Sequence, residues 1–252
     1  MNDPLISVKG LSVDYISEGA DINAVQNVSF DIYPGEVFGL VGESGSGKST
    51  VVQAMMRILP PPALISGGKV LINNQDIMTA SLSDIIGFRW KQISIVMQSA
   101  LNALNPVLSI REQINDVLVT HGGLTGEDAN DRAEELLSLV DLDPQRLNSY
   151  PHQLSGGMKQ RVVIAIALAI MPPIIIMDEP TTALDVIVER EIISKIIELR
   201  KKLGFTILFI THDLNLLLEF VDRLAIMKNG EIVELDGVCL LYTSPSPRDW
   251  LQ

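Results

Sequence analysis

Cysteine is almost absent from this sequence: Cys239 is the only one among 252 residues. A single cysteine cannot form an intrachain disulfide, so a fold held by internal disulfides is excluded. Positive charge is also scarce, since 19 Lys and Arg residues face 31 Asp and Glu residues and the formal net charge is −12. Nucleic acids are bound by clustered Lys and Arg, so this balance argues against nucleic acid as a partner.

The sequence also lacks an uninterrupted hydrophobic run long enough to cross a membrane, which takes about 20 residues. Its longest apolar segment, residues 162–177, is broken by Pro172 and Pro173. We interpret the first part as a buried helix and residues 174–177 as a buried strand rather than as a membrane span. The opening residues, MNDPLISVKG, carry neither the basic nor the apolar region of a secretory signal. These absences favour a reducing cytoplasm as the compartment.

What is present is an alternation of strand and helix patterns in a chain with 47% hydrophobic residues. Residues 6–15 and 24–32 alternate apolar and polar positions, which is typical of half-buried antiparallel strands. Further strands are expected at 36–42, 69–73, 92–98, 174–178, 205–212, 224–227 and 231–234, and helices at 48–58 and 185–203. Residues 108–149 read as polar helices inserted in this pattern. The alternation predicts an α/β fold with a mostly parallel sheet and helices on both faces.

A glycine-rich segment, GESGSGKST, matches the P-loop pattern G-x-x-x-x-G-K-[ST] between an apolar strand and a helix. In such a loop, backbone N–H groups face the β- and γ-phosphates, Lys48 adds a positive charge, and the Ser49 hydroxyl binds Mg²⁺. A chance glycine turn would match about once in a hundred chains of this length. We therefore predict an ATP site. Its residues are Gly42, Glu43, Ser44, Gly45, Ser46, Gly47, Lys48, Ser49 and Thr50.

An acidic pair, Asp178 and Glu179, ends the apolar strand IIIMD. The carboxyl ends of strands in open α/β sheets are where ligands collect, and the P-loop opens from the same edge. Asp178 then fits a second Mg²⁺ ligand, and Glu179 fits a group that orients and polarises the attacking water. A lone acidic pair would otherwise be a solvated turn, but its placement beside the P-loop favours the functional interpretation.

Three more polar or aromatic residues, Gln98, His212 and Tyr15, each end a predicted strand. Gln98 fits a ligand of Mg²⁺ or water, His212 fits a contact to the γ-phosphate, and Tyr15 fits an adenine-stacking ring. Taken singly, each has a structural alternative as a solvated amide, a structural histidine or a good β-former.

Assembled in this order, residues 6–234 resemble an ATPase subunit of the ABC type. The resemblance identifies the Walker A motif at 42–50, the Q-loop at Gln98, Walker B at 174–178, the catalytic glutamate at Glu179 and the switch histidine at His212. It places the signature motif at Leu154, Ser155, Gly156 and Gly157, the D-loop at 182–185 with Asp185, and the adenine-stacking aromatic at Tyr15. It implies a P-loop NTPase core with an N-terminal antiparallel β subdomain and an all-helical insertion at about 100–157, within one domain spanning residues 1–237.

The signature motif LSGG precedes an apolar helix and, taken alone, would be a serine cap with a glycine turn. In the family this motif closes on the γ-phosphate held by a partner's P-loop. The resemblance therefore implies a second ABC ATPase subunit, with ATP and Mg²⁺ as cofactors. It also implies membrane permease subunits, an extracytoplasmic solute-binding protein acting indirectly, and a peripheral position on the cytoplasmic face of the membrane. An isolated monomer should hydrolyse ATP poorly.

Finer features, GESGSGKST, the LNP at 104–106 and LSGGMKQR, are similar to the oligopeptide, dipeptide and nickel importer branch. In the family, the segment after the Q-loop receives the permease's coupling helices. The loop QSALNALNP in this chain differs from the sequence that is usual for the branch at that place. An exporter or lipoprotein-release motor is the alternative that these features disfavour. A soluble ABC ATPase acting on DNA or ribosomes would carry a long coiled-coil insertion or tandem domains. A regulator that does not hydrolyse ATP would be expected to lack Glu179 or His212.

The final segment, residues 238–252, begins neither a helix nor a clear strand. Its stretch CLLYTSPSPRD resembles the translation of a transposase sequencing adaptor, so we expect this tail to be aberrant or truncated rather than native sequence. The alternative is a genuine proline-rich start of a C-terminal extension.

Overall fold

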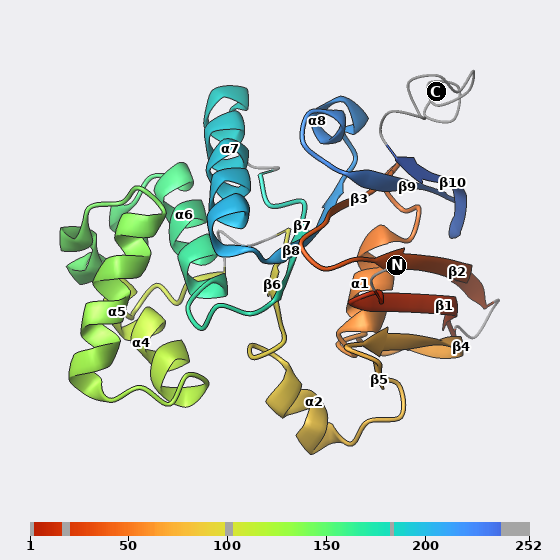
Figure 1. Cartoon of the computed structure of the whole chain (residues 1–252), viewed down its shortest axis with the longest axis horizontal. Coiled ribbons are helices and arrows are strands. Elements are labelled where there is room, and N and C mark those ends of the chain that lie inside the picture. The colour runs from red at the N-terminus through yellow and green to blue at the C-terminus, as the bar shows by residue number, and fades with distance from the viewer. Residues whose placement is uncertain (1–2, 17–20, 99–102, 182–183, 238–252) are drawn as a thin grey trace. The chain divides into compact units, whose positions relative to one another are not determined.

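The computed structural model describes residues 3–16, 21–98, 103–181 and 184–237 (Figure 1). The chain divides into two compact units: one combines the residues up to Ile86 with those from Thr206 onward, and the other runs from Gly87 to Phe205. The tail from residue 238 lies outside the described residues, so the prediction about its origin stays a prediction.

The first unit contains the predicted antiparallel β subdomain. Its strands are β1 (Ile6–Tyr15), β2 (Ile22–Ile32), β4 (Ala63–Ile72) and β5 (Gln75–Asp76), in the order β2-β1-β4-β5. Strand β4 begins six residues before the predicted start at residue 69. The part that was not predicted, residues 63–68, contains Gly67 and Gly68 and has little apolar alternation, yet this part of the strand pairs with β1. A Cβ atom at Gly68 would lie 2.5 Å from the Gly10 carbonyl oxygen, so the close approach of two backbones explains the glycine.

The same unit contains a second group of strands in the order β10-β9-β3-β8. They are β3 (Val37–Gly42), β8 (Thr206–Thr211), β9 (Arg223–Lys228) and β10 (Glu231–Gly237). Strand β3 pairs in parallel with β8 and β9, while β10 is antiparallel to β9. Every residue of β3 and β8 is buried, as expected for strands covered on both faces.

Helices α1 (Lys48–Met55) and α8 (Leu214–Leu218) also belong to this unit. Helix α1 ends three residues before the predicted end at residue 58. Arg57 takes a left-handed backbone conformation (φ 50°), which stops the helix ahead of the prolines at 60–62.

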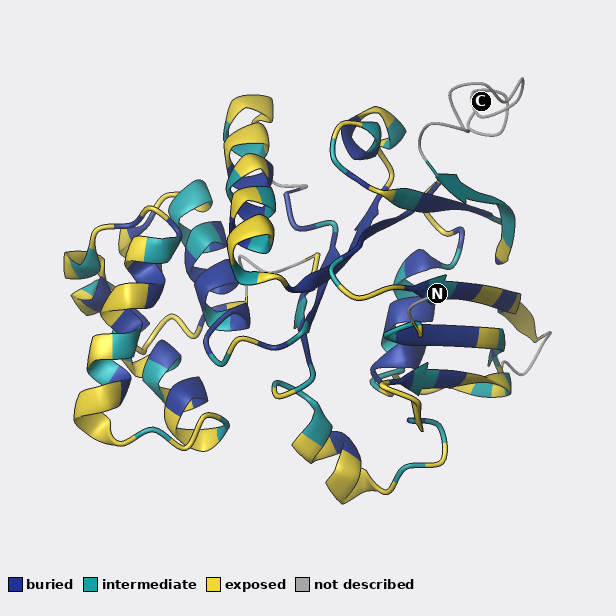
Figure 2. Cartoon of the chain, in the orientation of Figure 1, coloured by how far each residue is buried: buried dark blue, intermediate teal, exposed yellow. Residues whose placement is uncertain are grey.

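The second unit holds the parallel pair β6 (Ile93–Val96) and β7 (Ile174–Asp178) with most of the helices. These are α4 (Ile110–Thr120), α5 (Gly126–Leu139), α6 (Gly156–Ala167) and α7 (Val186–Leu203), with 3-10 turns η1 (Pro144–Asn148) and η2 (Pro151–Gln153); α2 (Leu82–Phe88) crosses the boundary between units. Helix α5 buries one apolar face, formed by Ala129, Ala133, Leu136 and Leu137. Figure 2 shows β7 buried along its length and the outer face of α7 exposed.

The apolar segment 162–177 forms part of α6 and the strand β7, as predicted. Within the described ranges, no helix has the length and apolar content needed to cross a membrane.

Candidate functional site

The P-loop connects β3 to α1, as the sequence predicted. Two of its glycines have positive φ, 81° at Gly45 and 101° at Gly47, and Gly47 is the N-cap of α1. A Cβ atom at Gly47 would lie 2.5 Å from the Ala24 carbonyl oxygen, and one at Gly42 would lie 2.2 Å from the Met227 carbonyl oxygen. The loop is therefore curled tightly against β2 and β9, which only glycine permits at these positions.

Lys48, the first residue of α1, is 5% exposed and its ammonium lies inside the loop. Its Nζ donates to the carbonyl oxygens of Gly42 at 2.7 Å and Glu43 at 2.8 Å. These bonds fix the positive charge at the start of the helix, where backbone N–H groups also favour an anion.

A small pocket of about 70 Å³ lies against this loop. It is lined by residues 43–46 together with Lys228 and Asn229 from the turn between β9 and β10. The next residue, Gly230, donates its N–H to the Ser46 carbonyl oxygen at 3.1 Å. The sequence did not predict this support, because the turn lies far along the chain and carries no pattern that links it to the loop.

Tyr15 and His212 also belong to the first unit. Tyr15 is half-buried at the end of β1, where it pairs in register with Ile22 and Ala63. His212 is exposed and follows the last residue of β8, Thr211, which is the register partner of Val41 near the end of β3. Since β3 and β8 are parallel, the structure brings His212 to the sheet edge from which the P-loop opens.

The acidic pair and the Q-loop glutamine belong to the second unit. Asp178, 3% exposed, ends β7, and β6 runs parallel to β7 so that Gln98 reaches the same edge. The Gln98 Nε2 donates to the Glu179 Oε2 at 2.8 Å, an interaction that the sequence did not predict. Glu179 has φ 47°, a backbone conformation that costs a non-glycine residue about 1–3 kcal/mol.

The signature motif and the D-loop aspartate each cap a helix in the second unit. The Ser155 hydroxyl accepts from the Met158 N–H at 3.3 Å at the start of α6. The Asp185 carboxylate accepts from the N–H groups of Ile187 and Val188, both at 3.1 Å, at the start of α7. The D-loop residues 182 and 183 lie outside the described residues. The serine cap that the sequence offered as a structural role is thus present, and it leaves the first N–H groups of α6 at an exposed helix terminus.

Magnesium was predicted to bind Ser49, Gln98 and Asp178. Gln98 and Asp178 follow adjacent strands of the second unit, whereas Ser49 lies in the first turn of α1 in the first unit. Over the part of the chain that is described, no group of three or more His, Cys, Asp or Glu side chains is placed to hold a metal ion. One carboxylate with polar oxygens fits Mg²⁺, which usually keeps several waters and phosphate oxygens as ligands.

Comparison with known proteins agrees with this arrangement. Residues 25–182 match the family model described as ABC transporter. Similar proteins include the peptidoglycan transport ATP-binding protein YejF of Agrobacterium fabrum (44% identical, covering 96% of this chain and 45% of that protein) and the oligopeptide transport ATP-binding protein OppD of Bacillus subtilis (40% identical, covering 98% and 70%). The chain thus spans less than half of the first relative and about two thirds of the second.

Two solved structures share the fold. The dimeric ATP-binding cassette MJ0796, in a post-hydrolysis state bound to ADP and Pi, has a TM-score of 0.82 at 33% identity and covers 92% of this chain and 98% of its own. The protein cbiO1 of Clostridium perfringens, part of an ABC transporter complex, has a TM-score of 0.83 at 27% identity and covers 99% and 98%. These matches confirm the predicted ABC-type P-loop fold and the predicted class of ATPase. The chain belongs to the ABC transporter family.

Proposed function

We propose that this chain is the ATP-hydrolysing subunit of a membrane importer for peptides or a related solute. One observation carries the hydrolytic part: the Gln98 amide holds the Glu179 carboxylate at the end of β7, in a chain that also has a P-loop with a buried lysine. The names of the relatives at 40–44% identity, which refer to peptidoglycan and oligopeptide transport, support the solute class.

ATP is the ligand that the P-loop fits. Gly45 and Gly47 have the positive φ values that curl the loop, and Lys48 holds a positive charge inside it. Residues 42–50 would bind the phosphates, and Tyr15, half-buried at a strand end, would stack on the adenine. A phosphate would replace neutral carbonyl partners of Lys48 by charged ones, which form stronger hydrogen bonds.

Hydrolysis needs a water held in line with the γ-phosphate. Glu179 is the residue proposed to orient and polarise this water, and the bond from Gln98 restricts how its carboxylate can turn. His212 is proposed to contact the γ-phosphate. Ser49, Gln98 and Asp178 are proposed to hold Mg²⁺, which would neutralise charge on the phosphates.

The signature motif is proposed to act in trans. Leu154, Ser155, Gly156 and Gly157 would face the nucleotide on a second ABC ATPase subunit, in line with the dimeric state of the MJ0796 cassette. Closing and reopening of this pair would drive alternating access in membrane permease subunits, which would receive the solute from an extracytoplasmic solute-binding protein. The chain would lie at the cytoplasmic face of the membrane, and nucleic acid would not be a partner.

The decisive experiment compares Glu179→Gln with Lys48→Ala. We expect Glu179→Gln to lower ATP turnover by a factor of about 10²–10⁴, the usual contribution of a general base, while ATP binding survives. Lys48→Ala should weaken nucleotide binding itself. Binding is measured with a fluorescent ATP analogue and turnover by phosphate release. Glu127→Gln, the same change in the exposed first turn of α5, is the matched control and should alter neither quantity.

Retained steady-state hydrolysis in Glu179→Gln would refute the role of that carboxylate. The solute class is tested separately, by stimulation of ATPase activity in vesicles that carry the permease encoded beside this gene, with its solute-binding protein and a series of peptides. Stimulation by no peptide, but by another solute, would refute the peptide assignment and leave the ATPase assignment intact.

A further inference from the structure

The signature helix α6 and the helix α7, which Asp185 caps, pack closely at their N-terminal ends. A Cβ atom at Gly157 would lie 2.8 Å from the Val188 Cγ1, and one at Gly156 would lie 3.3 Å from the Leu184 Cδ2. Both contacts lie within the second unit. The start of α6 therefore rests directly on the first turn of α7 and the residues that precede it.

Charged side chains continue this contact along both helices. Arg161 lies four residues after Gly157, and Glu191 and Lys195 lie three and seven residues after Val188. Residues at these spacings share one face of a helix, so the glycine contact and the charges form a single seam. The guanidinium of Arg161 lies 3.6 Å from the Glu191 carboxylate across this seam.

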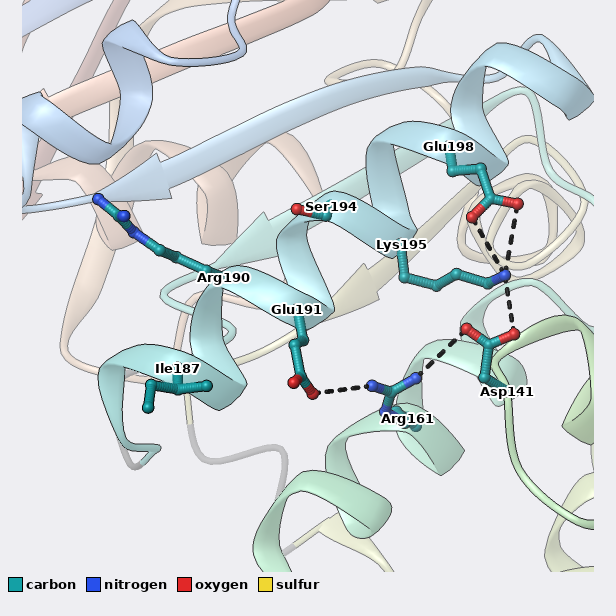
Figure 3. A pocket seen from close by; sticks show the side chains of 8 residues that line it. All are labelled: Asp141, Arg161, Ile187, Arg190, Glu191, Ser194, Lys195 and Glu198. Carbon is teal, nitrogen blue, oxygen red and sulfur yellow. Dashed lines mark hydrogen bonds and ion pairs between the residues drawn. The ribbon is translucent and has the colours of Figure 1, made fainter.

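Asp141, just after α5, joins both helices. Its carboxylate lies 2.9 Å from the Lys195 Nζ of α7 and 3.6 Å from the Arg161 guanidinium of α6, and Arg161 also donates to the Val140 carbonyl oxygen at 3.0 Å. Figure 3 shows these side chains turned toward one another. The hydrogen bond that Lys195 donates to the Asp141 carboxylate is the main cause of a raised pKa at Lys195, so this lysine stays charged.

These residues line a surface cleft of about 560 Å³. The charges facing each other across the cleft are paired, Arg161 with Asp141 and Glu191, and Lys195 with Asp141 and Glu198. A site built to bind a charged ligand would be expected to present an excess of one sign, whereas the cations lining this cleft, Arg161, Arg190 and Lys195, are matched in number by the carboxylates, Asp141, Glu191 and Glu198. Its geometry therefore favours a positioning role over a binding role.

We propose that Asp141, Arg161 and Lys195 are positioning residues that hold the signature motif at a fixed place relative to the D-loop aspartate on α7. This inference rests on the proposed function, in which the signature motif acts on a nucleotide bound to the partner subunit. A carboxylate shared by cations of both helices fixes the position of α6, which begins with that motif, against α7, which the D-loop aspartate caps.

The test uses the full chain with Asp141→Asn. Asparagine tolerates the left-handed backbone at this position (φ 57°), and the side chain is 56% exposed, so the variant is expected to fold. Glu198→Gln is the matched control, since the one ion pair that Glu198 forms among the described residues is with Lys195, on its own helix. Thermal unfolding of both variants checks that they are folded.

ATP-driven dimerisation, measured by sedimentation in the Glu179→Gln background, is expected to weaken about three- to tenfold in Asp141→Asn, the effect of losing partly exposed ion pairs. Binding of a fluorescent ATP analogue to the monomer should not change, because the P-loop belongs to the other unit. In the monomer, amide hydrogen exchange in residues 155–160 should become faster. Glu198→Gln should change none of the three quantities.

Dimerisation and exchange in Asp141→Asn equal to those of the control would overturn the inference. The failure of the parent chain to dimerise with ATP would instead refute the action in trans, and the exchange measurement would still decide the positioning role by itself. Equal loss in Asp141→Asn and Glu198→Gln would also overturn it, because the effect would then come from charge on α7 rather than from the link between helices.

Discussion

The P-loop contains two glycines with positive φ whose surroundings differ, and this difference gives a prediction for Gly47→Ala and Gly45→Ala. At Gly45 no described atom lies within 4 Å of an added Cβ, so only the backbone conformation opposes alanine. At Gly47 the same strain is joined by a contact of 2.5 Å to the Ala24 carbonyl oxygen, a backbone atom of β2 that cannot rotate away.

The expected losses of unfolding free energy follow from the backbone strain and from the steric contact. A positive φ costs an alanine about 1–2 kcal/mol, which is the whole effect expected for Gly45→Ala. Forcing a methyl group against packed backbone adds about 1–3 kcal/mol, so Gly47→Ala should lose about 2–5 kcal/mol of unfolding free energy. Losses of this size are a large part of the total stability of a typical domain, about 5–15 kcal/mol.

Urea unfolding followed by circular dichroism, without nucleotide, measures the two losses. Gly35→Ala is the control outside the loop, since Gly35 also has a positive φ (72°) and no described atom within 4 Å of an added Cβ. It should behave like Gly45→Ala. Equal losses in Gly45→Ala and Gly47→Ala would refute the claim that the approach to β2 requires glycine at position 47.

Two helix caps give further predictions. Ser109→Ala should lower unfolding free energy by about 1 kcal/mol, because the Ser109 hydroxyl caps α4. The same hydroxyl lowers the pKa of Glu112 from its usual 4.5. The hydrogen bond between the two side chains therefore stabilises the fold above pH 4.5, and this contribution is lost as acidification protonates Glu112. Acid unfolding monitored by circular dichroism should begin at higher pH in Ser109→Ala. Asp185→Ala should lose about 1 kcal/mol of unfolding free energy, measured by thermal unfolding, and Asp185→Ser should lose little, since serine also caps helices. Slow ATP turnover in both variants would show that the carboxylate is needed for more than the cap.

Much of the fold could be predicted because the pattern of apolar and polar residues within a short segment indicates a strand or a helix. The strand at 6–15 was predicted at its observed bounds and the strand from residue 174 at its observed start, and α7 ends at Leu203 as expected, since the left-handed Gly204 (φ 79°) stops it. The start of β4 was missed because its glycines and polar residues are held by pairing with β1 rather than by any apolar period. Backbone pairing at long range leaves little trace in the sequence.

The candidate site likewise combines positions that the sequence predicts with contacts that it does not predict. Each predicted group of the P-loop and of the β7 edge follows directly from a strand end, which is why its location could be predicted. The bond between Gln98 and Glu179, and the support of the P-loop by the turn at Lys228, join residues far apart in the chain. Contacts of this kind depend on side-chain geometry and on strand order, so they emerge only from the structure.

The two glycine-rich loops look alike in sequence, yet their glycines meet different requirements. In the P-loop, Gly45 and Gly47 take a backbone conformation that other residues avoid. In the signature motif, Gly156 and Gly157 are the first two residues of helix α6, and they are small because an added Cβ would meet Leu184 at the first position and Val188 of α7 at the second. The first requirement is local and can be inferred from the motif alone. The second belongs to a pair of helices, so the signature motif cannot be understood apart from the helix that Asp185 caps.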